Sequence, residues 1–216
     1  MFEKILNLIF PNVCGFCNTI NKNCLCKKCE LELANYELNC IKDYRNDKSK
    51  HFDFLFCALK YENMVRQKIM GYKFGEKSYL YKTFAKIIIK NKKIYGFIKL
   101  YDIIIPVPMY KTKESVRGYN QSKLLAEELA VNTGIDIEKK VLNKTKDTKV
   151  QSTLSKSQRS INVKNAFEIK DKEKVNVKKI ILVDDIYTTG STVNECSRIL
   201  KKAGAKEILV ITIAKG

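Results

Sequence analysis

Ile180-Ile-Leu-Val-Asp-Asp-Ile-Tyr-Thr-Thr-Gly-Ser-Thr192 is the stretch that decides the fold of this chain. An apolar run leads into two adjacent carboxylates, Asp184 and Asp185, and apolar residues at helical spacing follow a short Thr/Gly/Ser turn. Gly204 stands where a left-handed residue would end that helix. The pattern predicts a buried strand, a tight loop and a helix. Such a loop offers backbone N–H groups and hydroxyls to an anion at the helix N-terminus.

The two carboxylates are expected at the carboxyl end of their strand, which is where open α/β sheets bind ligands. Carboxylates beside a phosphate cradle suit a ligand that also carries sugar hydroxyls or a Mg²⁺ ion. The stretch resembles the phosphoribosyl-pyrophosphate (PRPP) signature of type I phosphoribosyltransferases, in which two acidic residues and two variable residues precede Thr-Thr-Gly-Ser-Thr. The alternative is a generic strand-to-helix turn, but such a turn needs neither the paired Asp residues nor two Thr residues before the Gly.

Length, apolar runs and net charge limit the class of protein to which the chain can belong. Its 216 residues suit one medium domain with a small appendage. An apolar run of about 18 residues is absent, so no transmembrane helix is expected. The first residues also make a poor signal peptide, which favours a cytoplasmic location without membrane insertion. The net charge of +18 suits a polyanionic partner such as a phosphorylated substrate or nucleic acid. The alternative is a Lys-rich composition spread over solvated faces.

Two Cys-x-x-Cys pairs lie close together near the N-terminus. Cys14-Gly-Phe-Cys17 and Cys26-Lys-Lys-Cys29 each bring two thiolates together, and two such pairs predict a tetrahedral four-cysteine site for Zn²⁺. Two disulfides or a redox pair are the alternatives. Four protein thiolates would close the site, so we expect a structural zinc. We expect residues 1–45 to form a zinc-binding subdomain, a polar linker over 41–51, and a second domain over 52–216.

A second informative loop follows the apolar run that begins at Asp102. Pro106 and Pro108 stiffen the chain after the predicted strand, and a basic loop over 111–117 comes next. Asn120 is a suitable N-cap for a helix over 121–132. We expect the loop to bind a second anion beside the first, and the alternative is a surface loop with routine Lys residues.

Two further polar segments carry candidate ligands. Residues 144–167 are hydroxylic and basic, and such a long loop inside a compact domain is usually functional. Its closure would bring Lys149 and Arg159 to a bound diphosphate. Lys73 stands at a break between two predicted helices, over 62–72 and 78–91, and is a candidate contact for phosphate or DNA.

These motifs together resemble the ComF family. They comprise the paired cysteines, Lys73-Phe74-Gly75, Pro106-Val-Pro108 with Arg117-Gly-Tyr-Asn-Gln-Ser122, the Gln151-to-Phe167 segment and the PRPP signature. The resemblance implies an α/β type I phosphoribosyltransferase fold, a parallel sheet flanked by helices, joined to a zinc ribbon. It also implies a role in natural competence: handling incoming single-stranded DNA in the cytoplasm, beside a membrane channel and a helicase-like partner. Many relatives carry a second set of Cys pairs, whereas only Cys40 remains here, so we expect one zinc.

The resemblance also implies roles for residues in binding PRPP with Mg²⁺. The loop of Thr188, Thr189, Gly190, Ser191 and Thr192 would hold the 5′-phosphate, and Asp184 and Asp185 the ribose hydroxyls and Mg²⁺. The diphosphate would contact Pro106, Val107, Pro108 and Lys111. The candidate catalytic groups are Asp184, Asp185, Arg117 and Arg159. Three functions stay open: a phosphoribosyltransferase acting in DNA uptake, a non-catalytic nucleotide-sensing or DNA-binding module that kept the pocket, and a nucleobase-salvage enzyme unrelated to DNA.

Overall fold

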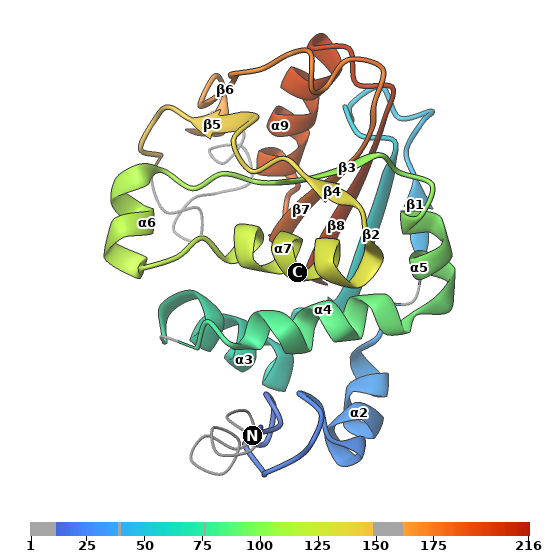
Figure 1. The fold of residues 1–216 in the computed structure, drawn as a ribbon, viewed down its shortest axis with the longest axis vertical. Helices are drawn as coiled ribbons and strands as arrows, with labels where there is room; N and C mark the ends of the chain where they lie inside the picture. The colour runs from blue at the N-terminus through green and yellow to red at the C-terminus, as the bar shows by residue number, and fades with distance from the viewer. Residues whose placement is uncertain (1–11, 39, 76, 149–161) are drawn as a thin grey trace, which may run out of the picture.

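The fold is built on a six-stranded sheet with the strand order β1-β2-β8-β7-β3-β4 (Figure 1). The computed structural model describes residues 12–38, 40–75, 77–148 and 162–216. Every pairing in this sheet is parallel except that of β1 with β2. The strands are β1 (Ile41–Asp43), β2 (Phe54–Lys60), β3 (Ile103–Pro106), β4 (Asp136–Ile137), β7 (Lys179–Tyr187) and β8 (Glu207–Lys215). The predicted parallel sheet is thus confirmed.

The central strands are apolar on both faces because helices cover both sides. Successive residues of β7 alternate between two cores: Ile181 and Val183 face one, and Ile180 and Leu182 face the other. Parallel sheets covered on both faces have this near-continuous apolar composition. β7 continues two residues beyond Asp185, to Tyr187, so the two carboxylates lie close to the carboxyl end of the strand, as expected.

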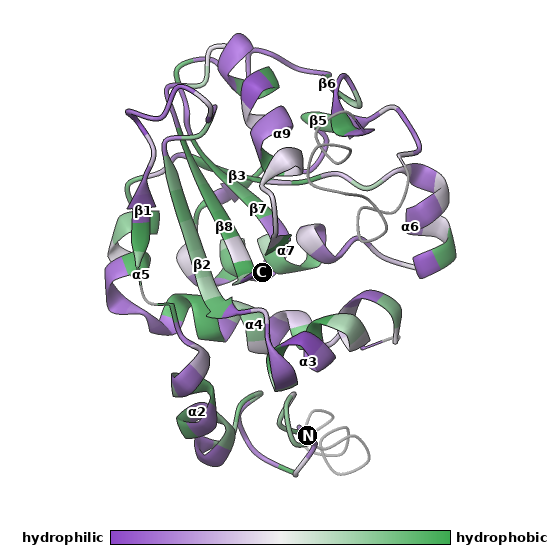
Figure 2. Ribbon diagram, turned by 180° about the vertical axis from the view of Figure 1, so that it is seen from behind, coloured by the Kyte–Doolittle hydropathy of each residue, from purple (hydrophilic) through white to green (hydrophobic). Residues whose placement is uncertain are grey.

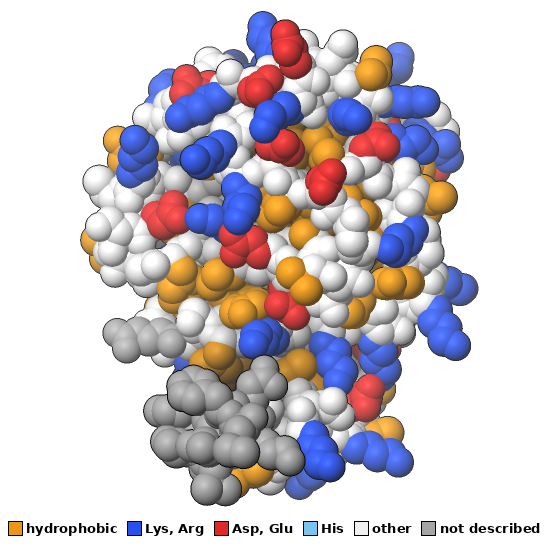
Figure 3. Space-filling view, in the orientation of Figure 1, with side chains coloured by type: hydrophobic (Ala, Val, Ile, Leu, Met, Phe, Trp, Pro, Cys, Tyr) orange, Lys and Arg blue, Asp and Glu red, His pale blue; other side chains and the backbone are white. Residues whose placement is uncertain are grey.

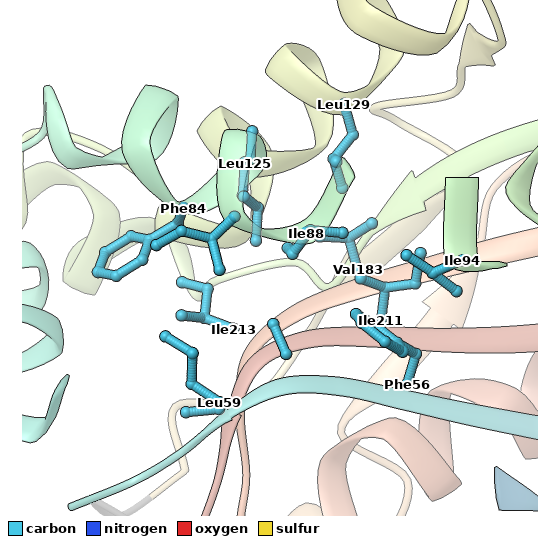
Figure 4. Packing of buried hydrophobic residues seen from close by; sticks show 14 of the residues in the cluster. Phe56, Leu59, Phe84, Ile88, Ile94, Leu125, Leu129, Val183, Ile211 and Ile213 are labelled. Carbon is cyan, nitrogen blue, oxygen red and sulfur yellow. The ribbon is translucent and has the colours of Figure 1, made fainter. Parts of the chain in front are cut away.

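One face of the sheet carries α3 (Asn63–Phe74), α4 (Leu80–Lys90), α5 (Lys92–Ile98) and α7 (Gln121–Thr133). Figure 4 shows Ile88 of α4 next to Val183 of the sheet, and Phe84 of α4 on the side of Ile213. The opposite face carries α9 (Ser191–Lys202) and the two-stranded hairpin of β5 (Leu142–Lys144) and β6 (Phe167–Ile169), as Figures 1 and 2 show.

The structure corrects two expectations about irregular segments. Lys111–Arg117, expected as a loop, is the helix α6. Glu114 in its first turn and Arg117 in its last complement the helix dipole, and Gly118 ends it with a φ of 82°. Residues 41–51, expected as a linker, belong to the sheet domain: β1 pairs with β2, and the Asn194 side chain accepts from His51 N (2.8 Å) and donates to Ser49 O (3.1 Å).

The N-terminal cysteine lobe, which we define as residues 12–38, packs on the outer side of α4. It contains the helix α2 (Lys27–Leu33) and the 3-10 turn η1 (Ala34–Tyr36) and lies below α3 and α4 in Figure 1. The Thr83 hydroxyl donates to Cys24 O at 2.9 Å, and the rings of Phe16 and Phe84 meet edge to face. A Cβ atom on Gly15 would collide with the Thr83 hydroxyl. The lobe therefore shares a packed interface with α4, and its status as a separate domain stays a prediction.

Candidate functional site

The loop between β7 and α9 forms a small pocket at the carboxyl end of the sheet. The N-terminus of the 12-residue helix α9 lies at this loop, so the positive end of its dipole lies beside the pocket. Thr189 Oγ1 and Ser191 Oγ are 2.8 Å apart and tie the loop together. The pocket is lined by Asp184, Ile186, Tyr187, Thr188, Gly190, Ser191, Thr192 and Val193. This geometry is that of an anion cradle with a carboxylate at its edge.

Gly190 is required at the tip of this cradle for two reasons. Its φ is 76°, in the left-handed region that side chains disfavour. A Cβ atom at this position would also lie only 2.5 Å from the Tyr187 hydroxyl. Tyr187 is buried and packs edge to face against Phe52, so its ring supports the loop from below.

Asp184 is held in one orientation by two hydrogen bonds to the same oxygen. Ser122 Oγ donates to Asp184 Oδ1 at 2.9 Å, and the backbone N–H of Asp185 donates to it at 2.9 Å. Burial raises the pKa of Asp184 above its ordinary value, and the adjacent carboxylate of Asp185 adds to the rise. Lys73 and the two hydrogen bonds oppose the shift without cancelling it.

Asp185 is paired with a lysine from a distant part of the chain. Lys73 Nζ, on the last turn of α3, lies 2.9 Å from Asp185 Oδ2. The two side chains are only 21% and 14% exposed, so water screens this pair less than a surface pair. Lys73 thus contacts the site through the second carboxylate of the signature.

Arg117 lies at the end of α6, beside the end of α3. Its guanidinium carbon is over the Phe74 ring, 4.8 Å from the centroid. Partial burial lowers the pKa of Arg117 from its ordinary value, and the negative charge of Asp185 opposes that shift. Lys73 and Arg117 therefore bring two positive charges to the two carboxylates.

Hydrogen bonds between α3 and α7 fix these charged groups relative to one another. The buried Tyr72 hydroxyl donates to Gln121 O at 2.8 Å, and the Tyr119 hydroxyl donates to Tyr72 O. Tyr72 directly precedes Lys73, and Gln121 directly precedes Ser122. The residues that hold Asp185 and Asp184 are therefore parts of one connected unit.

The loop after β3 lies beside the carboxylates, as expected. Pro106 is in register with Val183, and Val107 N donates to Val183 O at 2.9 Å. Asn120 holds this loop because its side-chain amide donates to Val107 O at 3.1 Å. The side-chain oxygen of Asn120 accepts from the first N–H groups of α7, so the predicted N-cap is confirmed.

The basic residues expected near the loop after β3 do not all lie at the candidate site. Lys111 is exposed at the start of α6, about 9 Å of helix axis before Arg117. Lys113 pairs with Asp147 at 2.7 Å and also donates to Thr148 O. Arg159 lies outside the described residues, as does Lys149.

The structure therefore gathers Asp184, Asp185, the Thr188–Thr192 loop and Pro106–Pro108 at one edge, with Arg117 beside Asp185. Reasoning from the sequence missed Ser122 as the partner of Asp184. The signal was present in the hexapeptide 117–122, where a hydroxyl follows the N-cap residue by two positions. It could not have shown which carboxylate the hydroxyl meets.

The four predicted cysteine ligands meet in the N-terminal lobe. The sulfur atoms of Cys14, Cys17, Cys26 and Cys29 all lie within 4.8 Å of one another, and this cluster could hold a metal ion. The side chain and backbone of Thr19 lower the pKa of Cys17 to about 6, whereas burial and the neighbouring cysteines raise the pKa of Cys29, so the cluster without a metal holds thiols and thiolates together. Cys57 and Cys196 are buried single thiols, whereas Cys40 is exposed.

Within the part of the chain that the structure describes, no helix has both the length and the apolar content needed to cross a bilayer.

Similarity to known proteins identifies the family. The phosphoribosyl transferase domain model matches residues 116–216. The chain is 32% identical to "Competence protein F" of Haemophilus influenzae, over 88% of this chain and 84% of that protein. It is 28% identical to "DNA utilization protein YhgH" of Escherichia coli strain K12, over 92% and 88% of the two chains, and 28% identical to "Competence protein ComFC" of Streptococcus pneumoniae, over 89% and 88%. With a phosphoribosyltransferase fold and an N-terminal four-cysteine cluster, the chain belongs to the ComF family of competence proteins.

Proposed function

We propose that this chain binds PRPP with Mg²⁺ at the β7–α9 loop and acts in natural competence on internalised single-stranded DNA. The observation that carries the proposal is the placement of two adjacent carboxylates at the edge of the α9 cradle. One is oriented by Ser122, and the other is neutralised by Lys73. A generic capped turn gives no reason for either contact.

In this proposal, each part of PRPP contacts its own group of protein residues. The 5′-phosphate takes hydrogen bonds from the Thr188–Thr192 loop, and the ribose hydroxyls contact Asp184 and Asp185. The diphosphate lies against Pro106–Pro108 and Arg117. Mg²⁺ would bind at the carboxylates and offset diphosphate charge as the C1′–O bond breaks. Arg159 and Lys111 are proposed as further diphosphate contacts.

The local charge balance supports a polyanionic ligand. Two carboxylates alone would repel a diphosphate, because like charges about 4 Å apart cost several kcal/mol at low effective dielectric. Lys73 and Arg117 supply compensating positive charge on the α3 and α6 side. The raised pKa of Asp184 lowers the negative charge further when the pocket holds no cation. The pocket can thus accept an anion at one end and a cation at the other.

The four-cysteine cluster is proposed to hold a structural Zn²⁺. A tetrahedron with Zn–S bonds of about 2.3 Å has edges of about 3.8 Å. The Cys17 and Cys26 sulfur atoms are already 3.7 Å apart. All four positions would be filled by protein, which leaves none for substrate.

The DNA part of the proposal draws on the relatives and on charge. Two of the relatives are named as competence proteins and one as a DNA utilization protein. A net charge of +18 suits a polyanionic strand. Figure 3 shows Lys and Arg scattered over one face among acidic side chains, without a single basic track among the described residues on that face. A cytoplasmic location and a helicase or channel partner belong to the same proposal.

Calorimetric titration with PRPP and Mg²⁺ tests the pocket. The native protein should bind, Asp184→Ala should lose binding, and Asp136→Ala, which removes an exposed carboxylate on the edge strand β4, should bind normally. The absence of PRPP binding in the native protein would overturn the proposal.

Two further measurements separate the candidate functions. PRPP binding without diphosphate release in the presence of any nucleobase would favour the non-catalytic module. Single-stranded DNA affinity should fall as the salt concentration rises. DNA binding that is absent or independent of salt would favour the salvage enzyme over a role in DNA uptake.

A further inference from the structure

The end of α3 presents an aromatic ring to solvent next to the candidate site. Phe74 is 62% exposed, although burying such a ring is worth about 1.5–3 kcal/mol. Met70, four residues earlier, lies on the same side of the helix and is 42% exposed. The buried face of α3 is formed by other residues: Val65, Ile69 and Tyr72. Phe74 and Met70 therefore form a separate, outward apolar face.

This exposed ring has a cation on one side and the site carboxylates nearby. The Arg117 guanidinium lies over the ring at 4.8 Å from its centroid. The preceding residue, Lys73, forms the 2.9 Å ion pair with Asp185. Figures 1 and 2 both show α6 above α3 on the same side of the molecule, in agreement with the contact between Arg117 and Phe74. The ring is thus one residue away from the group that neutralises the second carboxylate.

We propose that Phe74, with Arg117 stacked on it, is a platform for an unpaired nucleobase whose sugar and phosphate lie toward the β7–α9 pocket. The inference rests on the proposed function of that pocket. An aromatic ring can stack on any of the four bases, because each base has a π face, and an arginine adds a cation–π contact. A stacked guanidinium keeps its edge N–H groups free for phosphate oxygens, so Arg117 can serve both the base platform and the anion.

The surroundings favour a base over an apolar peptide segment. The guanidinium of Arg117 lies over the ring, and the residue before Phe74, Lys73, carries a second positive charge that is paired with Asp185. An apolar peptide anchor would bury the Arg117 guanidinium without giving it a new hydrogen-bond acceptor, which is costly. A nucleotide instead brings a π face for the ring and phosphates for the cations. A mononucleotide and a DNA strand both supply this chemistry, which is a nucleobase on a sugar phosphate.

The test compares ligands with and without a base. Four ligands are titrated: PRPP with Mg²⁺, AMP, an oligo(dT) strand and an abasic strand of the same length. Phe74→Ala should weaken binding of AMP, oligo(dT) or both by about 5- to 150-fold, the range measured for loss of one stacked base. Binding of PRPP and the abasic strand should fall by no more than about fivefold, because these ligands lose only the exposed cation–π contact that helps to hold Arg117. Phe74→Trp should retain the affinity for base-carrying ligands.

Leu100→Ala is the matched control, since Leu100 is also a large apolar residue, 59% exposed, on the segment after α5. It should change none of the four affinities. If Phe74→Ala loses affinity for AMP alone, the platform binds the base of a mononucleotide. If it loses affinity for oligo(dT) alone, the platform binds a base of a DNA strand. Unchanged affinity for both in Phe74→Ala, or an equal loss for PRPP, would overturn the platform while leaving the PRPP pocket intact. Failure of the native protein to bind PRPP would instead overturn the proposed function.

Discussion

Replacing Gly190 with alanine is expected to destabilise the protein by about 2–5 kcal/mol. The first contribution is the left-handed backbone, at a φ of 76°, which costs a non-glycine residue about 1–2 kcal/mol. The second is the new Cβ atom, which would lie 2.5–2.7 Å from three atoms of the Tyr187 side chain. That ring is buried and packed against Phe52, and overpacking of this kind costs about 1–3 kcal/mol.

Two other glycines separate these contributions. Gly134 has a φ of 69°, and a Cβ atom added there would have nothing within 4 Å, so Gly134→Ala should show the backbone cost alone, about 1–2 kcal/mol. Gly96 lies inside α5, outside the left-handed region and with the same open space, so Gly96→Ala should be neutral or stabilising by up to about 1 kcal/mol. The order of stability among the three variants is therefore fixed by the structure.

Urea unfolding at a constant zinc concentration measures the three free energies of unfolding, and similar m values would show that the comparison is valid. The reasoning about the Tyr187 contact would be refuted if Gly190→Ala and Gly134→Ala lost the same stability within about 0.5 kcal/mol. A loss of PRPP binding in Gly190→Ala under conditions where it remains folded would show that the cradle itself depends on this contact.

Three further outcomes are expected. Ser122→Ala removes the hydroxyl that orients Asp184. It should weaken PRPP binding in calorimetry by about 10-fold or more, which is the effect of losing a hydrogen bond to a charged group. An unchanged affinity would contradict the positioning role of Ser122. Because the pKa of Asp184 is raised on folding, the native state binds protons more tightly than the unfolded chain, so stability should fall as the pH rises above about 4. Asp184→Asn should reduce that fall in urea titrations between about pH 5 and 8, and equal slopes would argue against it. Metal analysis should find one zinc in the native protein and in Cys24→Ser, but a loss in Cys26→Ser; equal zinc in all three would exclude the proposed ligands.

Features that depend on neighbouring residues were predictable from the sequence. The strand, loop and helix around Asp184 followed from periodicity and from Gly190 and Gly204, whose φ angles are both positive. The four-cysteine cluster followed from spacing, because each Cys-x-x-Cys pair brings its own two thiols together. The short helix α6 was missed because its seven residues carry no apolar periodicity, and its helical conformation depends on end effects.

Contacts between distant parts of the chain were not predictable. Asp184 is 62 positions away from Ser122, its hydrogen-bond donor. Asp185 pairs with Lys73, which is on α3, before β3 in the sequence. The sequence marked Lys73 as a candidate for phosphate or DNA, and the structure shows it paired with a carboxylate. Phe74 stood within a recognised motif, yet its exposure and its stacking with Arg117 depend on how α3 and α6 meet.

The packing of the cysteine lobe on α4 has a consequence for how this architecture can evolve. The lobe contributes a hydrogen-bond acceptor, a ring and a glycine to the interface at Thr83 and Phe84, and α4 packs in turn against α7. Recombination that exchanged the lobe alone between relatives would mismatch this interface. We therefore expect that the lobe and α4 are exchanged together when recombination preserves the fold. Changes on the lobe side of α4 would therefore act on the helix that also packs against α7, whose first turn carries Ser122.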